Sequence, residues 1–272
     1  MIMSSVTQRI HEIAQPYGGY LKLSDFEKAC FDDGVILSDF ENVSGSRIGL
    51  VVDYLTRFYF SGDNRKAFNI CLLGAKVAKR FFGLDKAVDI CMENLAGFKK
   101  FDTDAAITRA CELAAFDVFY RNPLVVARTL ELHGSLSVIF EEPPDNTTIE
   151  NIRVMLHRSA AFFEKCGSVT ASGFDFAPFG YSEMVLSGDG DFLTADTLWD
   201  MKVYKPSTKI DKNDRLQVLM YWIMGQHSKQ EIFKGITKLG LYNPRQNVAY
   251  TLEVAKIPYE VIREVEEKVI CY

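Results

Sequence analysis

The spacing of apolar residues predicts a helical first part of the chain. In 44–62 the apolar residues fill the middle of a segment that serines can cap at its start and a Ser-Gly pair can end, which predicts one helix. Three further segments within 63–133 place apolar residues at three- and four-residue spacing, as amphipathic helices do. A polar, proline-containing break at 141–148 then precedes another helix that extends to about Lys165.

Beyond about residue 167 the pattern becomes that of strands. Residues 167–204 are rich in Val, Thr, Phe, Tyr and Gly, which predicts several strands joined by tight turns. Helical spacing returns in 211–228, and 235–257 has the pattern of a hairpin that turns at 243–247. Pro258 is placed to begin a final charged helix. The order β-β-β-α-β-β-α behind a helical region predicts a mixed α/β fold.

Composition agrees with one folded domain. The 272 residues suit a single domain over 1–272, in which 63–165 is a helical insertion and 167–257 holds the core sheet and the active site. Hydrophobic residues make up 48% and charged residues 25%, as in ordinary globular proteins. The net charge of −5 excludes a protein coated in basic residues, but it permits a local basic groove.

Several classes of protein are not expected. No run of about 18 apolar residues is present, and the first residues have neither the basic nor the apolar region of a secretory signal. The six cysteines are scattered without a Cys-x-x-Cys pair, so we expect buried thiols, no zinc or iron–sulfur site, and a cytoplasmic protein without membrane contact.

The first sign of chemistry is a concentration of negative charge on one apparent hairpin. The segment 187–207 contains four aspartates, Asp189, Asp191, Asp196 and Asp200. A turn at 194–197 would bring Asp191 and Asp200 to the same end of adjacent strands, where bare carboxylates repel each other. A divalent cation removes this repulsion, and Mg²⁺ commonly takes one or two carboxylates and completes its shell with water and phosphate. Asp191 and Asp200 are therefore predicted metal ligands, whereas Asp189 and Asp196 suit the opposite face and the turn.

Lys202 follows Asp200 at a spacing that puts both side chains on one face of a strand. An ammonium group beside a metal-bound water and a phosphate can orient the water, help to deprotonate it, or stabilise developing charge. Met201 should face the opposite side, although its carbonyl group could reach the metal ion. The alternative is a solvated hairpin with a surface salt bridge worth less than about 1 kcal/mol.

The downstream helix adds an amide and a phenol. Gln217 and Tyr221 are four residues apart and therefore lie on one face of an otherwise apolar helix. Buried polar groups need partners, and the lysine, a metal-bound water or a phosphate would serve. A pair satisfied by the backbone is the alternative.

Together these residues resemble a known superfamily. Gly188-x-x-Asp191, Asp200-x-Lys202 and Gln217-x-x-x-Tyr221, in the order strand, strand, helix, resemble the PD-(D/E)XK nuclease superfamily, and the last motif resembles its RecB-like exonuclease family. The resemblance covers 180–225 closely. It implies a restriction-endonuclease-like αβββαβ core with a large helical insertion or N-terminal helical region. It also implies a metal-dependent deoxyribonuclease that uses Mg²⁺ or Mn²⁺.

The resemblance also implies roles for single residues. Asp191 and Asp200 would hold the metal, Lys202 would position the attacking water, Gln217 would orient the lysine or the water, and Tyr221 would touch a phosphate. Members of the family carry a further Gly and an acidic residue on an upstream helix, and Gly49-x-x-x-Asp53 could supply this metal ligand. Glu183 could add a carboxylate, but a surface position suits it better.

The sequence leaves three functional alternatives open. The same core could be an exonuclease, an endonuclease or an inactive nucleic-acid-binding protein, and the choice between DNA and RNA stays open.

A basic stretch follows the hairpin and could contact phosphates, with an ordinary charged loop as the alternative. It consists of Lys202, Lys205, Lys209, Lys212 and Arg215.

Overall fold

The computed structural model describes residues 4–272, which form two compact units. The sheet unit combines the described residues up to Asp33 with Phe162–Tyr272, and the helical unit is Gly34–Ala161. The fold is mixed α/β, as the sequence predicts. The helical unit contains most of the expected insertion 63–165, and it begins earlier in the chain. Among residues 4–272 no helix has the length and apolar character needed to cross a membrane.

The helical unit is built from the segments that show helical spacing. Its helices are α2 Gly45–Ser61, α3 Asn64–Ala67, α4 Asn69–Phe82, α5 Ala87–Ala96, α6 Asp104–Ala114, α7 Asp117–Arg121, α8 Pro123–His133 and most of α9 Asn146–Cys166. Helix α2 confirms the prediction for 44–62, because Ser44 is its N-cap and Gly62 ends it in the left-handed conformation.

Close packing within this unit depends on one small residue. A Cβ atom at Gly74 of α4 would lie 1.8 Å from the carbonyl oxygen of Phe116, so only glycine allows the helices to approach this closely. Nearby, the buried hydroxyl of Tyr54 donates to Asp117, which satisfies a polar pair inside the core.

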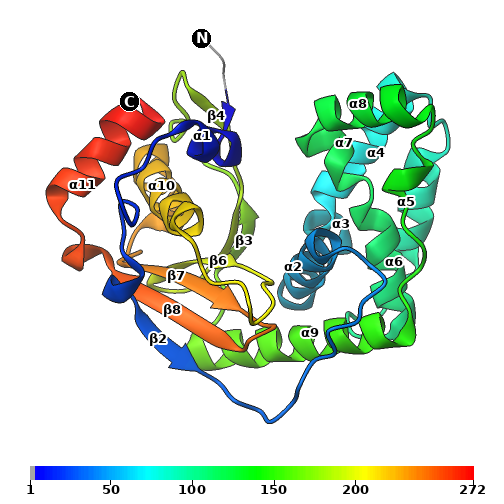
Figure 1. Ribbon diagram of the computed structural model, residues 1–272, viewed down its shortest axis with the longest axis horizontal. Helices are drawn as coiled ribbons and strands as arrows, with labels where there is room; N and C mark the ends of the chain where they lie inside the picture. Colours follow the sequence, from blue (N-terminus) through cyan, green and yellow to red (C-terminus); the bar gives the residue numbers. More distant parts are fainter. Residues whose placement is uncertain (1–3) are drawn as a thin grey trace. The chain divides into compact units, whose positions relative to one another are not determined.

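The sheet unit contains one large sheet and one small one (Figure 1). The strands are β1 Ser4–Ser5, β2 Glu27–Cys30, β3 Ala171–Phe174, β4 Val185–Ser187, β5 Gly190–Leu193, β6 Thr197–Met201, β7 Lys238–Asn243 and β8 Val248–Glu253. The large sheet has the order β2-β8-β7-β6-β5-β3, and within it only β6 and β7 run parallel. The predicted hairpin of 235–257 is confirmed as β7 and β8.

Two strands lie where the local pattern does not predict them. All residues of β2 are exposed, yet this strand pairs with β8 from more than two hundred positions away. Strand β4 lies outside the large sheet and pairs with β1 in parallel, so the neighbour of β5 at the edge of the large sheet is β3.

Helix α10, Lys212–Ser228, confirms the helix predicted for 211–228 and covers one face of the large sheet (Figure 1). On this face Leu198, Leu241 and Leu252 pack with apolar residues of the helix. Residues of alternate parity face the other way, where Trp199 and Tyr242 meet Phe162 at ring-centroid distances of 4.9 and 3.8 Å. The sheet unit therefore has an apolar layer on each face.

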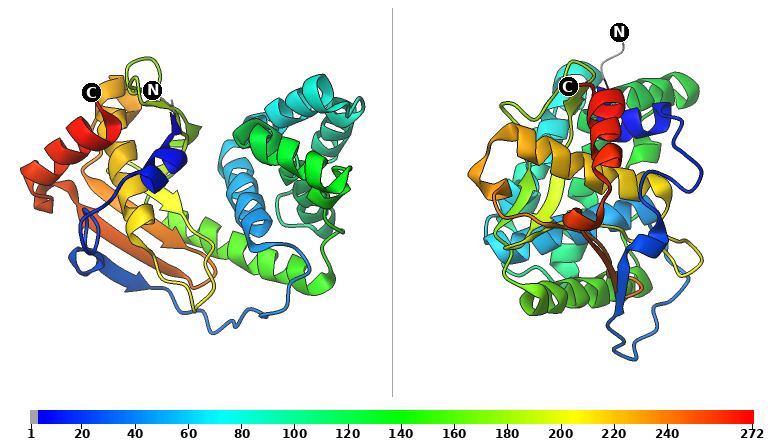
Figure 2. Two further views of the ribbon diagram at one scale, coloured as in Figure 1. Left: turned by 45° about the horizontal axis from the view of Figure 1, so that its top comes forward. Right: turned by 90° about the vertical axis from the view of Figure 1, so that its left-hand side faces the viewer.

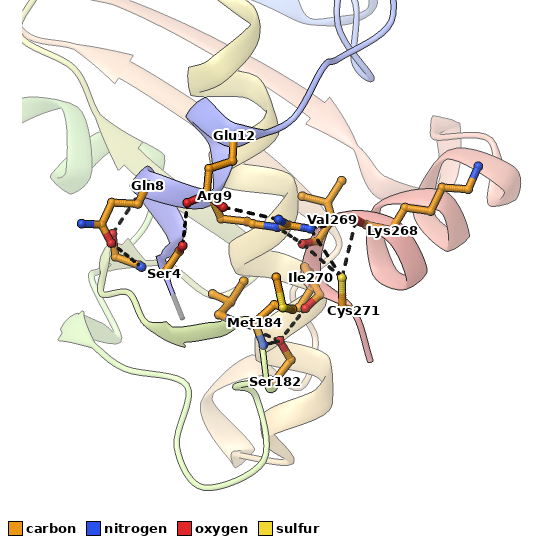
Figure 3. Close-up of polar contacts among 12 residues, drawn as sticks. Ser4, Gln8, Arg9, Glu12, Ser182, Met184, Lys268, Val269, Ile270 and Cys271 are labelled. Atoms are coloured by element: carbon orange, nitrogen blue, oxygen red, sulfur yellow. Dashed lines mark hydrogen bonds and ion pairs between the residues drawn. The ribbon is translucent and has the colours of Figure 1, made fainter. Parts of the chain in front are cut away.

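Helix α11, Tyr259–Glu264, follows Pro258 as predicted and continues as a π-helical stretch, Val265–Ile270, which lies beside α10 (Figure 2). The opposite end of the chain is fastened to this stretch by Arg9 of α1, Val6–Glu12. The Arg9 guanidinium donates to the carbonyl oxygens of Val269 at 2.8 Å and Lys268 at 3.1 Å (Figure 3).

The prediction that the cysteines are buried thiols is confirmed only in part. All six are free, as predicted, and Cys71, Cys91 and Cys111 are buried. Cys30 and Cys166 are exposed, because the first lies on the uncovered edge strand β2 and the second ends α9.

Candidate active site

The β5–β6 hairpin brings Asp191 and Asp200 together. Strand pairing joins Phe192 to Trp199, and the turn is closed by a 3.0 Å hydrogen bond from the Thr194 amide to the Thr197 carbonyl. Extending this register by one pair sets Asp191 opposite Asp200. Asp191 Oδ2 accepts a hydrogen bond of 2.7 Å from the Met201 amide, which fixes its carboxylate at the end of the hairpin.

Asp200 is a carboxylate in a buried place. The residue is 2% exposed, and its Oδ2 atom accepts no well-aligned hydrogen bond, although Lys202 Nζ lies 2.9 Å away as an ion-pair partner. Burial raises the pKa of Asp200 to about 7, because Asp191 and Asp214 add to this effect and Lys202 only partly opposes it. Such a group is poised to exchange its proton for a cation.

Lys202 is held as an ammonium ion. Besides Asp200, its Nζ atom lies 2.9 Å from Oε1 of Gln217 and 3.6 Å from Oδ1 of Asp214. Burial alone would lower the pKa of Lys202, but the carboxylates of Asp200 and Asp214 outweigh it and raise the pKa above its usual value. The lysine therefore carries its charge while it lies between these acceptors.

Gln217 connects the lysine to Tyr221. The amide oxygen accepts from Lys202, and the amide nitrogen donates to the Tyr221 hydroxyl at 2.8 Å. Tyr221 is 3% exposed, and burial raises its pKa, so the phenol stays neutral. Because its oxygen accepts from Gln217, the phenol keeps its own proton for donation. The structure thus brings Asp191, Asp200, Lys202, Gln217 and Tyr221 into one group.

Asp214 is a participant that the sequence analysis does not assign to the site. This buried residue accepts from the Tyr204 hydroxyl at 2.9 Å and also from the Asp211 amide, as half of the capping box that begins α10. The signal was present in the sequence, since Asp214 lies one helical turn before Gln217 on the same face.

Arg215 does not belong to a phosphate-binding stretch, which corrects the expectation for this loop. It is 6% exposed, and its guanidinium donates to the backbone carbonyl groups of Leu21, Ile210 and Gly18. These bonds fasten α10 to the first segment of the chain. The other lysines of the stretch, Lys205, Lys209 and Lys212, are exposed.

The other candidate residues are Asp53, Met201, Glu183 and Asp196. Asp53 lies on α2 of the helical unit and forms an ion pair of 2.6 Å with Arg57. Its role as a metal ligand, like that of the Met201 carbonyl, stays a prediction. Glu183 is exposed ahead of β4, and Asp196 forms a 2.9 Å ion pair with Lys238 at the hairpin turn.

The donor set suits a hard divalent cation. Among residues 4–272 no group of three or more His, Cys, Asp and Glu side chains is arranged to hold a metal. Mg²⁺ and Mn²⁺ do not need one, because two carboxylates together with water and substrate oxygens satisfy them. The Oδ2 atom of Asp200 is buried, accepts no well-aligned hydrogen bond and lies beside Asp191, so these carboxylates fit such an ion.

Comparison with known proteins adds no family to this description. No family model, no curated protein and no solved structure matches the chain.

Proposed function

We propose that this protein is a metal-dependent deoxyribonuclease that resembles the RecB-like exonucleases. The observation that carries the proposal is the unbroken line of contacts from Asp200 through Lys202 and Gln217 to Tyr221, with Asp191 beside its first member. A solvated surface hairpin has no reason to join a buried carboxylate and a buried phenol to a half-buried carboxylate, ammonium group and amide.

The order of elements supports the restriction-endonuclease-like core. Helix α9 precedes the antiparallel strands β3, β5 and β6, and α10 then leads to β7, which runs parallel to β6. This is the αβββαβ order that the resemblance implies, with β4 set aside in the small sheet.

Asp191 and Asp200 would hold the metal ion. When bound, Mg²⁺ or Mn²⁺ supplies Lewis acidity toward a phosphate oxygen and lowers the pKa of a coordinated water. The chain's own contribution is a fixed pair of carboxylates, because the Met201 amide orients Asp191 and strand β6 orients Asp200.

Lys202 would orient water and stabilise negative charge on the phosphate rather than accept a proton. Its ammonium group has acceptors on Asp200, Asp214 and Gln217, and these keep it protonated. A fixed positive charge in a buried place is most effective where negative charge develops in the transition state.

Gln217 and Tyr221 would act mainly by positioning Lys202. The amide of Gln217 is anchored by the buried phenol, so its oxygen is directed at the lysine. Phosphate contact by Tyr221 remains part of the proposal, since the phenol keeps a proton to donate.

The loop after β6 supports a nucleic-acid substrate. Gln246 donates to the carbonyl groups of Tyr204, Lys205 and Thr208, which holds the loop in place. Lys209 on this loop and Lys212 at the start of α10 are exposed. Lysines on a fixed loop beside the site suit contacts with DNA phosphates.

The test is digestion of end-labelled linear DNA and of circular DNA, with and without Mn²⁺. We expect metal-dependent loss of linear DNA, and resistance of the circle if an end is required. Lys202→Ala should reduce the rate by at least about 10²-fold, because it removes the fixed charge. Lys238→Ala, which removes an exposed lysine paired with Asp196, is the matched control and should cleave normally. Full activity of Lys202→Ala would reject the proposed site.

A further inference from the structure

The helical unit contains a cavity of about 560 Å³ that no residue of the proposed nuclease site lines. This volume falls in the range of about 300–1,000 Å³ typical of small-molecule sites. Its inner wall consists of apolar side chains that are at most 5% exposed: Val43, Ala87, Cys111, Ala115 and Phe116. Burial raises the pKa of the Cys111 thiol to about 12, so this wall carries no charge of its own. Ile90 and Phe140, 42% and 39% exposed, form the more open part of the lining.

One side of the cavity wall is held in place by hydrogen bonds. The segment 139–143 is fastened to residues 42–47 by three hydrogen bonds, from Asn42 Nδ2 to the Pro143 carbonyl, from the Ser44 amide to Glu141, and from Arg47 Nη2 to the Ile139 carbonyl. The ring of Phe140 packs edge-on against Phe116 at 5.4 Å. A cavity that keeps its shape loses less entropy when a ligand enters.

The charged residues of the lining are unbalanced. Four are acidic and two are basic: Asp85, Glu112, Glu141 and Glu142 against Arg47 and Lys86. Arg47 is already used, because its Nη2 atom donates to Ile139 and lies 3.9 Å from Glu141. Glu112 accepts from the side-chain amide of Asn94 at 2.9 Å, and Glu112 and Glu142 are both exposed at the edge of the cavity. The excess of acidic groups repels DNA and carboxylate ligands and attracts a cation.

We propose that this cavity binds a small apolar amine, with its apolar body against the inner wall and its ammonium group toward Glu112 and Glu142. The apolar wall supplies the driving force through burial of surface, and the carboxylates supply the preference for positive charge. The proposal is independent of the nuclease activity, because it uses other residues and a binding measurement.

The experiment compares three probes of one shape by titration calorimetry on the full chain. Naphthylmethylamine, naphthylmethanol and naphthoic acid share a bicyclic body and differ in charge. We expect one site for the amine, binding weaker by roughly fivefold for the alcohol, and the weakest binding for the acid.

Two variants locate the site, and the first has a matched control. Ile90→Arg adds a positive charge to the lining at a partly exposed position and should weaken binding of the amine by about tenfold. Leu124→Arg makes the same change on α8 at a residue that is 75% exposed and outside the lining, so it should have no effect. Glu112→Gln combined with Glu142→Gln should bring the amine to the affinity of the alcohol.

Three results would overturn the inference. The first is that none of the three probes binds. The second is that naphthoic acid binds as tightly as the amine. The third is that Leu124→Arg weakens binding as much as Ile90→Arg does.

Discussion

The two faces of strand β6 show how one short segment can serve packing and chemistry at once. Trp199 faces the end of α9 and packs edge-on against Phe162, at 4.9 Å between ring centroids. Asp200, its neighbour, faces α10 and meets Lys202 and Asp191. The first face is mostly aromatic, and the indole nitrogen of Trp199 donates to the Thr194 hydroxyl. The second face is apolar in its middle and polar only where the strand ends. The polar side chains therefore gather where the end of β6 meets the first turns of α10.

The largest expected effect comes from breaking the polar face. Asp200→Asn keeps the shape of the side chain and removes its charge, so DNA cleavage should fall by about 10³-fold. Stability at pH 8 should not fall, because burying an ionised carboxylate is itself costly. Cleavage assays and urea unfolding check both parts. A large loss of stability would show that Asp200 is needed for packing instead.

Breaking the aromatic face should have the opposite profile. Trp199→Ala removes a large buried side chain that also lies over Gly240, and we expect a loss of about 3–5 kcal/mol in the free energy of unfolding. Cleavage per folded molecule, measured at low temperature, should remain near normal. A specific loss of activity without unfolding would contradict the separation of the two faces.

Asp214→Asn tests whether the polar face extends to the capping box of α10. We expect a fall of about tenfold in kcat with KM unchanged, because one of the two carboxylates near Lys202 is lost. Asp211→Asn, which alters the other carboxylate of the same cap, is the matched control. Asp211→Asn should lose less than about 1 kcal/mol of stability, whereas Asp214→Asn should lose about 1–3 kcal/mol, because one of its two buried acceptor oxygens becomes a donor. Only Asp214→Asn should lose activity per folded molecule. Equal activity of the two would remove Asp214 from the site.

The polar face should also give stability a pH dependence. The folded pKa of Asp200 is raised to about 7, above the usual value near 3.9, so the protein without metal should lose stability as pH rises from about 4 through 7. Mn²⁺ must displace the proton, so the rise in Tm that it causes should be small at pH 6 and larger at pH 8. Thermal unfolding at several pH values measures this difference. An equal Mn²⁺ effect at both pH values, or none, would contradict metal binding at Asp200.

The smallest effect is expected at the hairpin turn, outside both faces. Asp196→Ala removes an exposed ion pair with Lys238 and a hydrogen bond from Thr197, which should cost less than about 1 kcal/mol. Chemical denaturation and the cleavage assay should both give values close to those of the original chain. A strong loss of activity would mean that the turn contacts the substrate.

Much of the fold could be predicted from the sequence, because caps, turns and the spacing of apolar residues depend on residues that are close together in the chain. The apolar stretch with a capping serine and a final glycine located α2, and alternation with a polar turn located β7 and β8. Strand β2 escaped prediction because its four residues are exposed and its stability comes from pairing with a distant strand. The departure of β4 to pair with β1 depends on tertiary packing in the same way.

The same difference between local and distant contacts decides which residues of the candidate site could be predicted. Asp191, Asp200 and Lys202 come together because pairing and pleat are fixed within one hairpin. Spacing along a helix likewise explains Gln217 and Tyr221. The capping role of Asp214 is local and follows from its spacing to Asp211, whereas its contact with Lys202 arises only when α10 lies on the sheet. The burial of Arg215 does not follow from local spacing, because its carbonyl partners Leu21 and Gly18 lie far away in the sequence.

The bonds of Arg9 to the π-helical stretch have a consequence for synthesis of the chain. Arg9 and Val269 are 260 positions apart, so α1 and β2 leave the ribosome long before the partners they need. The residues of the helical unit are contiguous, so this unit can fold as soon as they have been synthesised. The sheet unit can be completed only after the segment 162–272 has been synthesised. Nascent chains that stop before β8 would therefore hold their early segments unfolded and exposed to proteases.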